Sequence, residues 1–437
     1  MEILEYPQFT EKIYTLTLSN GLKINLLPRS GFHKTYGILT TDYGSIDNVF
    51  VPRGQEEMLK VPDGIAHFLE HKMFEKEDHD AFELFGRYGA EANAFTSFTQ
   101  TSYIFSTVQN VDKCVETLLD FVQTPYFSEQ TVEKEKGIIG QEIKMYDDDP
   151  GWQLYFGTIE NLYPNEPLSI DISGTIDSIA KITAKDLYTC YETFYHPSNM
   201  NLFLVGGFDV NQILNVIETN QAGKDFTPSS EIKRRAIGSN QEEADNQVIP
   251  YRMKELSVQR PKTAVGIKGI DEVPSGRAGL TYKLKLDLAL YLLYSETSDC
   301  YQELYDQGIL DDSFGYEFQL DRGFHFAIIS GDTEHPQDLS KAIVDIAEHA
   351  AETLRQKQVE FELAKKEMLG RYIQSLNSLE SIANRYEGNL FDSATVFDAV
   401  ALLEEITLND VVQVADAFFN LDAISVYQIL PKEDDAK

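Results

Sequence analysis

Alternating apolar and polar positions divide the first half of the chain into strands and helices in a mixed order. Residues 12–28 contain two alternating runs on either side of Asn20-Gly21, a turn sequence that favours a β-hairpin. Period-two alternation predicts further strands at residues 35–43, 91–98, 101–108 and 200–205. Helical periodicity predicts helices at residues 64–74, 81–88, 111–123, 129–147, 151–160 and 184–195. Long helices separated from antiparallel strands indicate an α+β fold.

The second half of the chain repeats this outline after a polar stretch with little periodicity. Strands are predicted at residues 263–268, 313–319 and 324–331, with a last strand ending near 429. Helices are predicted at residues 277–295, 298–306, 336–355, 359–376 and 405–419. A chain of 437 residues is too long for one ordinary core. We therefore predict two homologous α+β domains, each an antiparallel sheet packed with helices, at residues 1–220 and 248–437, joined by a linker at 221–247.

Charge and cysteine content narrow the class of protein. The formal net charge of −34 argues against binding to nucleic acid or to anionic membranes, although most of this charge can equally be solvated surface. No run approaches the roughly 20 apolar residues of a membrane span. The first residues are acidic and mixed, unlike a leader peptide. Three distant cysteines, Cys114, Cys190 and Cys300, are typical of reduced core residues, so we expect a cytoplasmic protein.

Candidate metal chemistry begins in the predicted helix at 64–74. His67 and His71 are four residues apart, so their side chains project from one face of a helix about one turn apart. Glu70 lies beside them, which gives the H-x-x-E-H pattern of the inverted zincins. Asp63 is a candidate N-cap for this helix. The alternative is an ordinary helix with two packed or solvated histidines.

A second helix, at residues 129–147, carries acids on the face that should be buried. At 100° per residue, one narrow stripe contains Glu135, Ile139, Glu142 and Tyr146. A buried carboxylate is costly unless it is paired or bound to a metal. Two salt bridges to distant basic residues would satisfy both acids equally well. Because the H-x-x-E-H pattern still needs a third ligand, the metal interpretation is favoured.

Several stretches of this sequence resemble the pitrilysin/insulinase family, which includes the mitochondrial processing peptidases. The metal motifs HFLEH (67–71) and EKEKGIIGQE (133–142) and the run NAFTS (93–97) carry the resemblance. The stretches GSIDNVFVP, VPDGIAHFLEHKMFEKED and FYHPSNM most resemble the YmfH-like bacterial subgroup of that family. The similarity extends over essentially the whole chain. It implies a duplicated fold with metal chemistry in the first half only, because the second half has no histidine pair.

The resemblance also implies roles for five residues. His67, His71 and Glu142 would hold one Zn²⁺ ion per chain, and Glu70 would be the catalytic base. Glu135, seven residues before Glu142, matches an acid that supports the ligands in the family. The helical stripe and the family motif therefore select the same two glutamates.

The predicted strand at 91–98 is a candidate for substrate binding. Its small residues would let another backbone approach closely, although an ordinary internal strand would look similar. In the family, the corresponding strand pairs with an extended substrate. This resemblance assigns substrate binding to Asn93, Ala94 and Phe95.

One family feature is missing from the second half of the chain. Active members usually carry an arginine and a tyrosine seven residues apart that help to hold the substrate carbonyl. Here Tyr305 stands at the arginine position and Asp312 at the tyrosine position, while using the nearby Tyr316 would need an insertion. We therefore expect a second family subunit, or another copy of this chain, to supply the pair in a dimer that encloses a chamber.

The sequence supports two main hypotheses of function. The first is a zinc endopeptidase that hydrolyses small or unfolded peptides inside a closed chamber. The second is a non-catalytic scaffold or peptide-binding subunit that retains the fold, as some family relatives do. The intact metal motif favours the enzyme, and the missing arginine–tyrosine pair favours the scaffold. A zinc hydrolase acting on non-peptide bonds fits the ligand spacing but not the resemblance.

Overall fold

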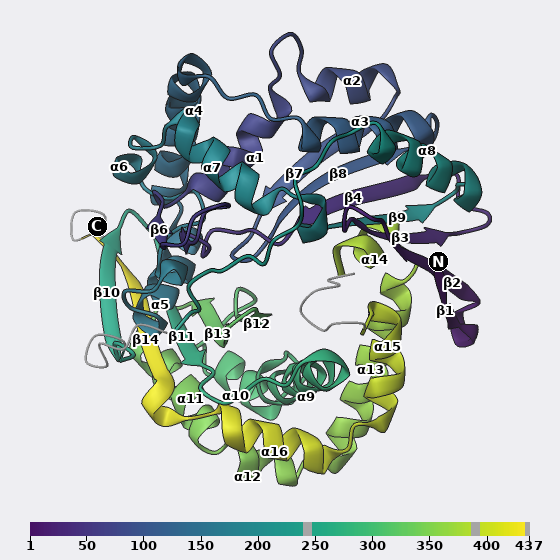
Figure 1. The fold of residues 1–437 in the computed structure, drawn as a ribbon. Coiled ribbons are helices and arrows are strands. Elements are labelled where there is room, and N and C mark those ends of the chain that lie inside the picture. The colour runs from purple at the N-terminus through teal and green to yellow at the C-terminus, as the bar shows by residue number, and fades with distance from the viewer. Residues whose placement is uncertain (239–246, 386–393, 433–437) are drawn as a thin grey trace. The chain divides into compact units, whose positions relative to one another are not determined.

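The computed structural model describes residues 1–238, 247–385 and 394–432, so residues 239–246 of the predicted linker lie outside the described residues. The chain forms two compact units (Figure 1). Unit 1 contains Met1–Ile143, Asp171–Arg235 and the described part of 375–387. Unit 2 contains Lys144–Ile170, Ala236–Gln374 and the described part of 388–437.

The two units differ from the predicted domains in two segments. A segment of the first predicted domain belongs to unit 2, and a segment of the second belongs to unit 1. Helix α5 (Pro150–Leu162) packs within unit 2 against strands β11 (Lys262–Lys268) and β14 (Ile424–Pro431). Its fit is close, since a Cβ atom added at Gly157 would lie 2.3 Å from the Tyr427 ring. Helix α14 (Leu379–Arg385) packs within unit 1 against β4 (Thr35–Thr41). Unit membership thus follows packing and not chain order.

Unit 1 is built on a seven-stranded sheet in the order β1-β2-β3-β9-β4-β8-β7. Its strands are β1 (Glu2–Tyr6), β2 (Glu11–Thr17), β3 (Lys23–Pro28), β4, β7 (Glu91–Thr96), β8 (Thr101–Thr107) and β9 (Met200–Gly206). The hairpin predicted around Asn20-Gly21 joins β2 and β3. Strands β3 and β9 pair in parallel, so the predicted antiparallel sheet is in fact mixed. Strands β4, β7 and β8 and several helices lie between β3 and β9 in the chain, so the connection is long enough for a parallel pair.

Helices cover this sheet and bury its core. Besides α14, the helices of the unit are α1 (Ile65–Phe74), α2 (Ala81–Arg87), α3 (Val111–Gln123), α4 (Glu129–Asp147), α6 (Ile176–Ile179), α7 (Ala184–Phe194) and α8 (Val210–Ala222). The last turn of α4, from Lys144, belongs to unit 2. A small hairpin joins β5 (Val49–Phe50) to β6 (Leu59–Lys60). Helices α1 and α3 lie over the sheet that contains β8 (Figure 1). Phe68 and Leu118 of these helices join Tyr103 and Phe105 of β8 in one apolar cluster.

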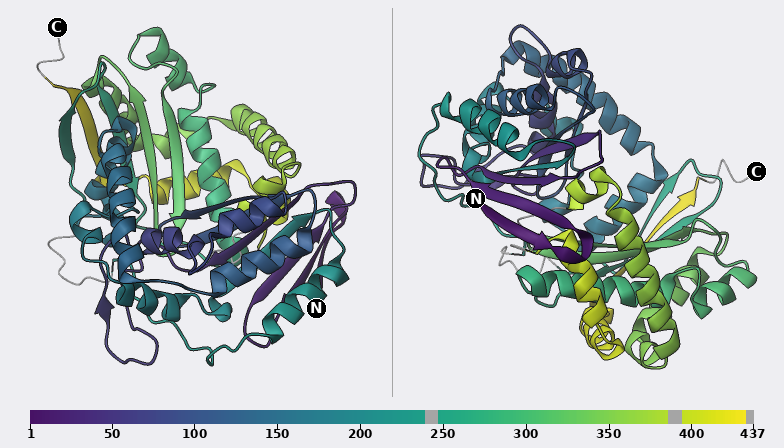
Figure 2. Two further views of the ribbon diagram at one scale, coloured as in Figure 1. Left: turned by 90° about the horizontal axis from the view of Figure 1, so that it is seen from above. Right: turned by 90° about the vertical axis from the view of Figure 1, so that its right-hand side faces the viewer.

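Unit 2 repeats the topology with a five-stranded sheet in the order β10-β14-β11-β13-β12. The remaining strands are β10 (Tyr251–Leu256), β12 (Gly315–Asp321) and β13 (Phe324–Asp332). In addition to α5, unit 2 contains the helices α9 (Gly276–Tyr294), α10 (Asp299–Asp306), α11 (Pro336–Glu348), α12 (Ala350–Arg355), α13 (Gln358–Ser375), α15 (Val396–Glu405) and α16 (Leu408–Phe418) (Figure 2). The order matches β3-β9-β4-β8-β7 strand by strand, including the parallel pair, here β10 with β14. The predicted α+β duplication is confirmed. Among the described residues, no helix combines the length and apolarity needed to cross a bilayer.

Candidate metal centre

The first turn of α1 is fixed by backbone packing. Gly64 occupies the N-cap position at φ 85°, so the prediction that Asp63 caps the helix is wrong. Asp63 is used elsewhere, because its carboxylate accepts a hydrogen bond from Asn48 Nδ2 at 2.6 Å. A Cβ atom at Gly64 would lie 2.4 Å from the carbonyl oxygen of Ser173. Only glycine combines this positive φ with such a close approach.

The rest of α1 presents two histidines on its one accessible strip. Every other residue of the helix is buried, and only His67 and His71 are partly exposed. Apolar side chains such as Phe68 and Leu69 anchor the helix in the core. Their burial fixes the rotation of the helix about its axis, so the two imidazoles face outward side by side, with ring centroids 4.5 Å apart.

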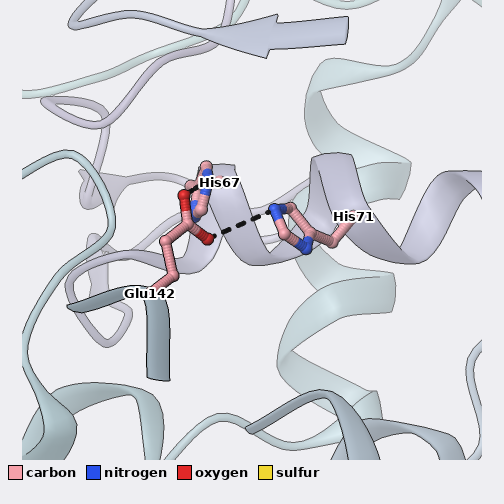
Figure 3. A group of neighbouring side chains, drawn as sticks. All are labelled: His67, His71 and Glu142. Atoms are coloured by element: carbon pink, nitrogen blue, oxygen red, sulfur yellow. Dashed lines mark ion pairs between the residues drawn. The ribbon is translucent and has the colours of Figure 1, made fainter. Parts of the chain in front are cut away.

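Helix α4 brings Glu142 to the two histidines. The Nε2 atom of His67 lies 3.7 Å from one carboxylate oxygen of Glu142, and the Nε2 atom of His71 lies 3.7 Å from the other (Figure 3). One donor atom from each of the three residues lies within 4.8 Å of the others. Ligands about 2.0–2.2 Å from a zinc ion are roughly 3.3–3.6 Å apart in tetrahedral geometry. The two 3.7 Å separations involve different oxygens of Glu142, so the three donor atoms must move closer together to share one ion. Two imidazoles and one carboxylate are nevertheless a donor set that zinc takes.

Glu135 lies behind this group on the same helix. Its carboxylate is 3.1 Å from Nδ1 of His71, so a proton on Nδ1 is donated to Glu135 and the Nε2 lone pair is left toward Glu142. Burial opposes the charged form of His71, but Glu135, Glu70 and Glu142 outweigh it and raise the pKa of that imidazole. Burial and the neighbouring His71 lower the pKa of His67 to about 3. His67 is therefore neutral at physiological pH, as a ligand must be.

Glu70 contacts strand β7. Its side chain is buried, and Oε2 accepts a hydrogen bond from the Thr96 hydroxyl at 2.7 Å. Burial raises the pKa of Glu70, while the Thr96 hydrogen bond opposes that rise. A carboxylate whose pKa is raised accepts a proton more readily than a solvated one, as a general base beside a metal-binding group must.

Strand β7 has one open edge, because it is the last strand of the sheet and, within the part of the chain that the structure describes, pairs only with β8. Ser97 donates its amide to the Gln100 carbonyl, so alternation along the ladder directs the backbone groups of Ala92, Ala94 and Thr96 to the open edge. The Ala94 amide is bonded there to the side chain of Asn93 at 2.9 Å.

The predicted substrate residues thus occupy one strand beside Glu70. Phe95 faces the same side of the strand as Asn93, while Ala94 packs against the core. Thr96 is not among the site residues predicted from the sequence. The signal that could have found it is the alternation of β7, which directs residues 92, 94 and 96 to the side that α1 covers.

The positions that replace the family's arginine and tyrosine both lie in unit 2. Tyr305 is exposed on α10 and stacks on Tyr301, with centroids 5.9 Å apart. Asp312 is exposed in the turn before β12, and Tyr316 lies on β12 itself. Asp312 cannot replace a tyrosine hydroxyl as a donor, because an ionised carboxylate only accepts hydrogen bonds.

A duplicated α+β fold with an H-x-x-E-H helix and a distant glutamate in one half defines the class of inverted zincins. Residues 49–175 match the model of the insulinase family, peptidase family M16, and residues 181–368 match that of the peptidase M16 inactive domain. The chain belongs to this family.

Relatives of known name and structure agree with this placement. The chain is 48% identical to a Bacillus subtilis protein named uncharacterized zinc protease YmfH, over 98% of this chain and 99% of the relative. A crystal structure of an M16-like peptidase from Alicyclobacillus acidocaldarius has a TM-score of 0.87 and 34% identity, covering 98% of this chain and all of that one (100%). A protease structure from Helicobacter pylori, with a TM-score of 0.78 at 21% identity over 96% of this chain and 100% of its own, shares the fold.

Proposed function

We propose that this chain is a zinc-dependent endopeptidase. The observation that carries the proposal is the group formed by His67, His71 and Glu142, whose donor atoms lie within 4.8 Å of one another. Glu70, buried beside this group, is the acid that peptide hydrolysis needs and that a scaffold has no reason to bury. Relatives named as zinc proteases support the same activity.

The residues of unit 1 divide the chemistry among them. His67 Nε2, His71 Nε2 and one Glu142 oxygen would hold the zinc ion. When bound, zinc supplies a Lewis acid that lowers the pKa of water toward neutrality and polarises a carbonyl. Glu70 takes the proton of the attacking water on Oε1 and passes it to the leaving amine, while Oε2 stays bonded to Thr96. Glu135 holds the His71 ring in the tautomer that a ligand requires.

Strand β7 offers the place where substrate would bind. Its open edge presents backbone donors and acceptors at Ala92, Ala94 and Thr96. An extended peptide could pair with this edge through main-chain hydrogen bonds, while side-chain contacts with Asn93 and Phe95 set preference. Only a small or unfolded peptide can offer a free extended strand, so we propose such peptides as substrates, cleaved inside a closed chamber.

A partner completes the proposal. Tyr305 and Asp312 lack the chemistry of the arginine–tyrosine pair, so a second family subunit would supply it, in a cytoplasmic dimer. A homodimer is the alternative arrangement. The same two residues favour the competing function of a peptide-binding subunit without catalysis.

Metal analysis and peptide cleavage test the proposal. The wild-type chain should carry one zinc ion, and it should cleave an unstructured peptide faster with a co-expressed family partner than alone. Glu70→Gln should keep zinc and lose turnover, whereas His67→Ala or Glu142→Ala should lose zinc. A zinc-loaded Glu70→Gln variant that hydrolyses peptides at the wild-type rate would exclude the mechanism. A wild-type chain that binds peptide with zinc but never cleaves it would favour the scaffold.

A further inference from the structure

Thr96 connects the open edge of β7 to the carboxylate of Glu70. It is the last residue of the strand, and its side chain lies on the face that α1 covers. Its hydroxyl donates to Glu70 Oε2 at 2.7 Å, across 26 positions of sequence. Among the described residues, this is the only hydrogen bond that the Glu70 carboxylate receives.

A hydrogen bond to one oxygen of a buried carboxylate fixes the orientation of the whole group. Glu70 can rotate about three side-chain bonds, and burial alone does not select one orientation. With Oε2 held by the hydroxyl, Oε1 is the oxygen left to receive a proton. Proton transfer depends on such orientation, because a displacement of about 1 Å can lower a rate by roughly a hundredfold.

We propose that Thr96 is a positioning residue that orients Glu70 and makes its orientation depend on the strand that receives the substrate. This inference rests on the proposed peptidase function and deepens it. The backbone amide and carbonyl of Thr96 point to the open edge of β7, while its side chain holds the base. A peptide that pairs with the edge therefore fixes the same residue that aligns Glu70.

Isosteric removal of the hydroxyl gives a direct test. Thr96→Val should lower kcat by about tenfold to a hundredfold, with KM within about twofold of wild type and unchanged zinc content. Thr96→Ser, which keeps the hydroxyl, should restore most of kcat. Thr40→Val on β4 is the matched control, because its hydroxyl bonds Ser102 at 2.8 Å on the opposite face of the sheet. This control should keep the wild-type kcat.

A second measurement does not depend on activity or metal. Urea unfolding of the chelator-treated wild type, Thr96→Val, Glu70→Ala and the double variant forms a thermodynamic cycle. The double variant should have a higher urea midpoint than the sum of the two single shifts predicts, because the hydrogen bond is lost only once.

Two results would overturn the inference. One is additivity in the cycle. The other is an active wild-type enzyme whose Thr96→Val variant keeps kcat within twofold, or whose Thr96→Ser variant loses as much kcat as Thr96→Val. A wild-type protein that fails to cleave any peptide, alone or with its partner, contradicts instead the proposed function on which the inference rests.

Discussion

The carboxylate of Glu135 lies 3.1 Å from Nδ1 of His71, on the same helix as Glu142 and two turns before it. A single helix therefore contributes one acid to the metal-binding group and another to the back of a histidine in that group. Because Nδ1 donates to Glu135, Nε2 cannot carry the proton in neutral His71. Glu135, which is not one of the three candidate ligands, thus leaves the Nε2 lone pair of His71 free toward Glu142.

Removing this support should weaken metal binding without abolishing it. Glu135→Ala leaves all three donors in place but frees the ring and tautomer of His71, so zinc affinity should fall by roughly 10–100-fold. Competition titration with a chromophoric chelator measures this change. Glu133→Ala is the control on the same helix, since Glu133 is exposed and pairs only with Lys136 among the described residues. Equal affinities for the two variants would show that Glu135 does not support the ligand.

Packing at Gly64 should be as important to the metal centre as the ligands themselves. Gly64→Ala introduces a side chain at φ 85°, 2.4 Å from the Ser173 carbonyl oxygen, which must displace the first turn of α1. We expect the free energy of unfolding to fall by about 1–3 kcal/mol and the affinity for zinc to fall as well.

Gly54→Ala separates the effect of the positive φ from the effect of the steric clash with Ser173. Gly54 also has a positive φ, 76°, but no atom lies within 4 Å of the added Cβ. The Gly54→Ala substitution should lower the free energy of unfolding only by the backbone strain, about 1 kcal/mol, and leave zinc binding unchanged. Urea unfolding and the same chelator titration compare the variants. Equal losses in both would assign the effect of Gly64→Ala to strain alone.

The metal-binding face could be predicted from the sequence because helix geometry is local. Spacings of four residues in α1 and seven in α4 determine which side chains share a face, whatever the tertiary structure. Acids on the face of α4 that was predicted to be buried then required a partner, and the structure provides His71 for Glu135. Period-two alternation likewise predicted nearly every strand that has a buried face.

Other features depend on contacts that no local pattern records. Gly64 replaced Asp63 as the cap because of the neighbouring Ser173 backbone. Strand β10 was missed because its alternation covers only Tyr251-Arg252-Met253-Lys254, next to the polar stretch taken for the linker, and almost all of its residues are exposed. Helix α5 has the pattern of any buried helix, and only its contact with β11 and β14 assigns it to unit 2.

The buried Lys76 should make stability depend on pH. Its ammonium donates to the carbonyl oxygens of Phe121 and Thr124, and burial, with a smaller effect of Lys72, lowers its pKa to about 7. In the unfolded chain a lysine titrates near about 10.4. Between these values the unfolded chain binds more protons, so this group makes the free energy of unfolding rise as pH increases from about 7 to 10.

Lys76→Met removes this contribution. Its free energy of unfolding should lack the rise, so the difference between wild type and variant should change in favour of the wild type as pH increases. Urea midpoints at pH 7, 8 and 9 measure that difference, which also cancels the titration of tyrosines and cysteines common to both proteins. A difference that stays constant over this range would place the folded pKa of Lys76 near its ordinary value.

Asn93 should protect the open edge of β7 until a peptide replaces it. Its side-chain oxygen accepts the Ala94 amide at 2.9 Å, the position where a substrate carbonyl would bind. Asn93→Ala should therefore speed hydrogen exchange at the Ala94 amide by about tenfold, while the Phe95 amide, which faces β8, stays protected. Residue-resolved exchange mass spectrometry measures both amides. Adding excess peptide to the doubly substituted Asn93→Ala, Glu70→Gln protein should slow exchange at Ala94 again, because an uncleaved strand then occupies the edge. If the exchange rate of the Ala94 amide does not change when peptide is added, the substrate does not pair with β7.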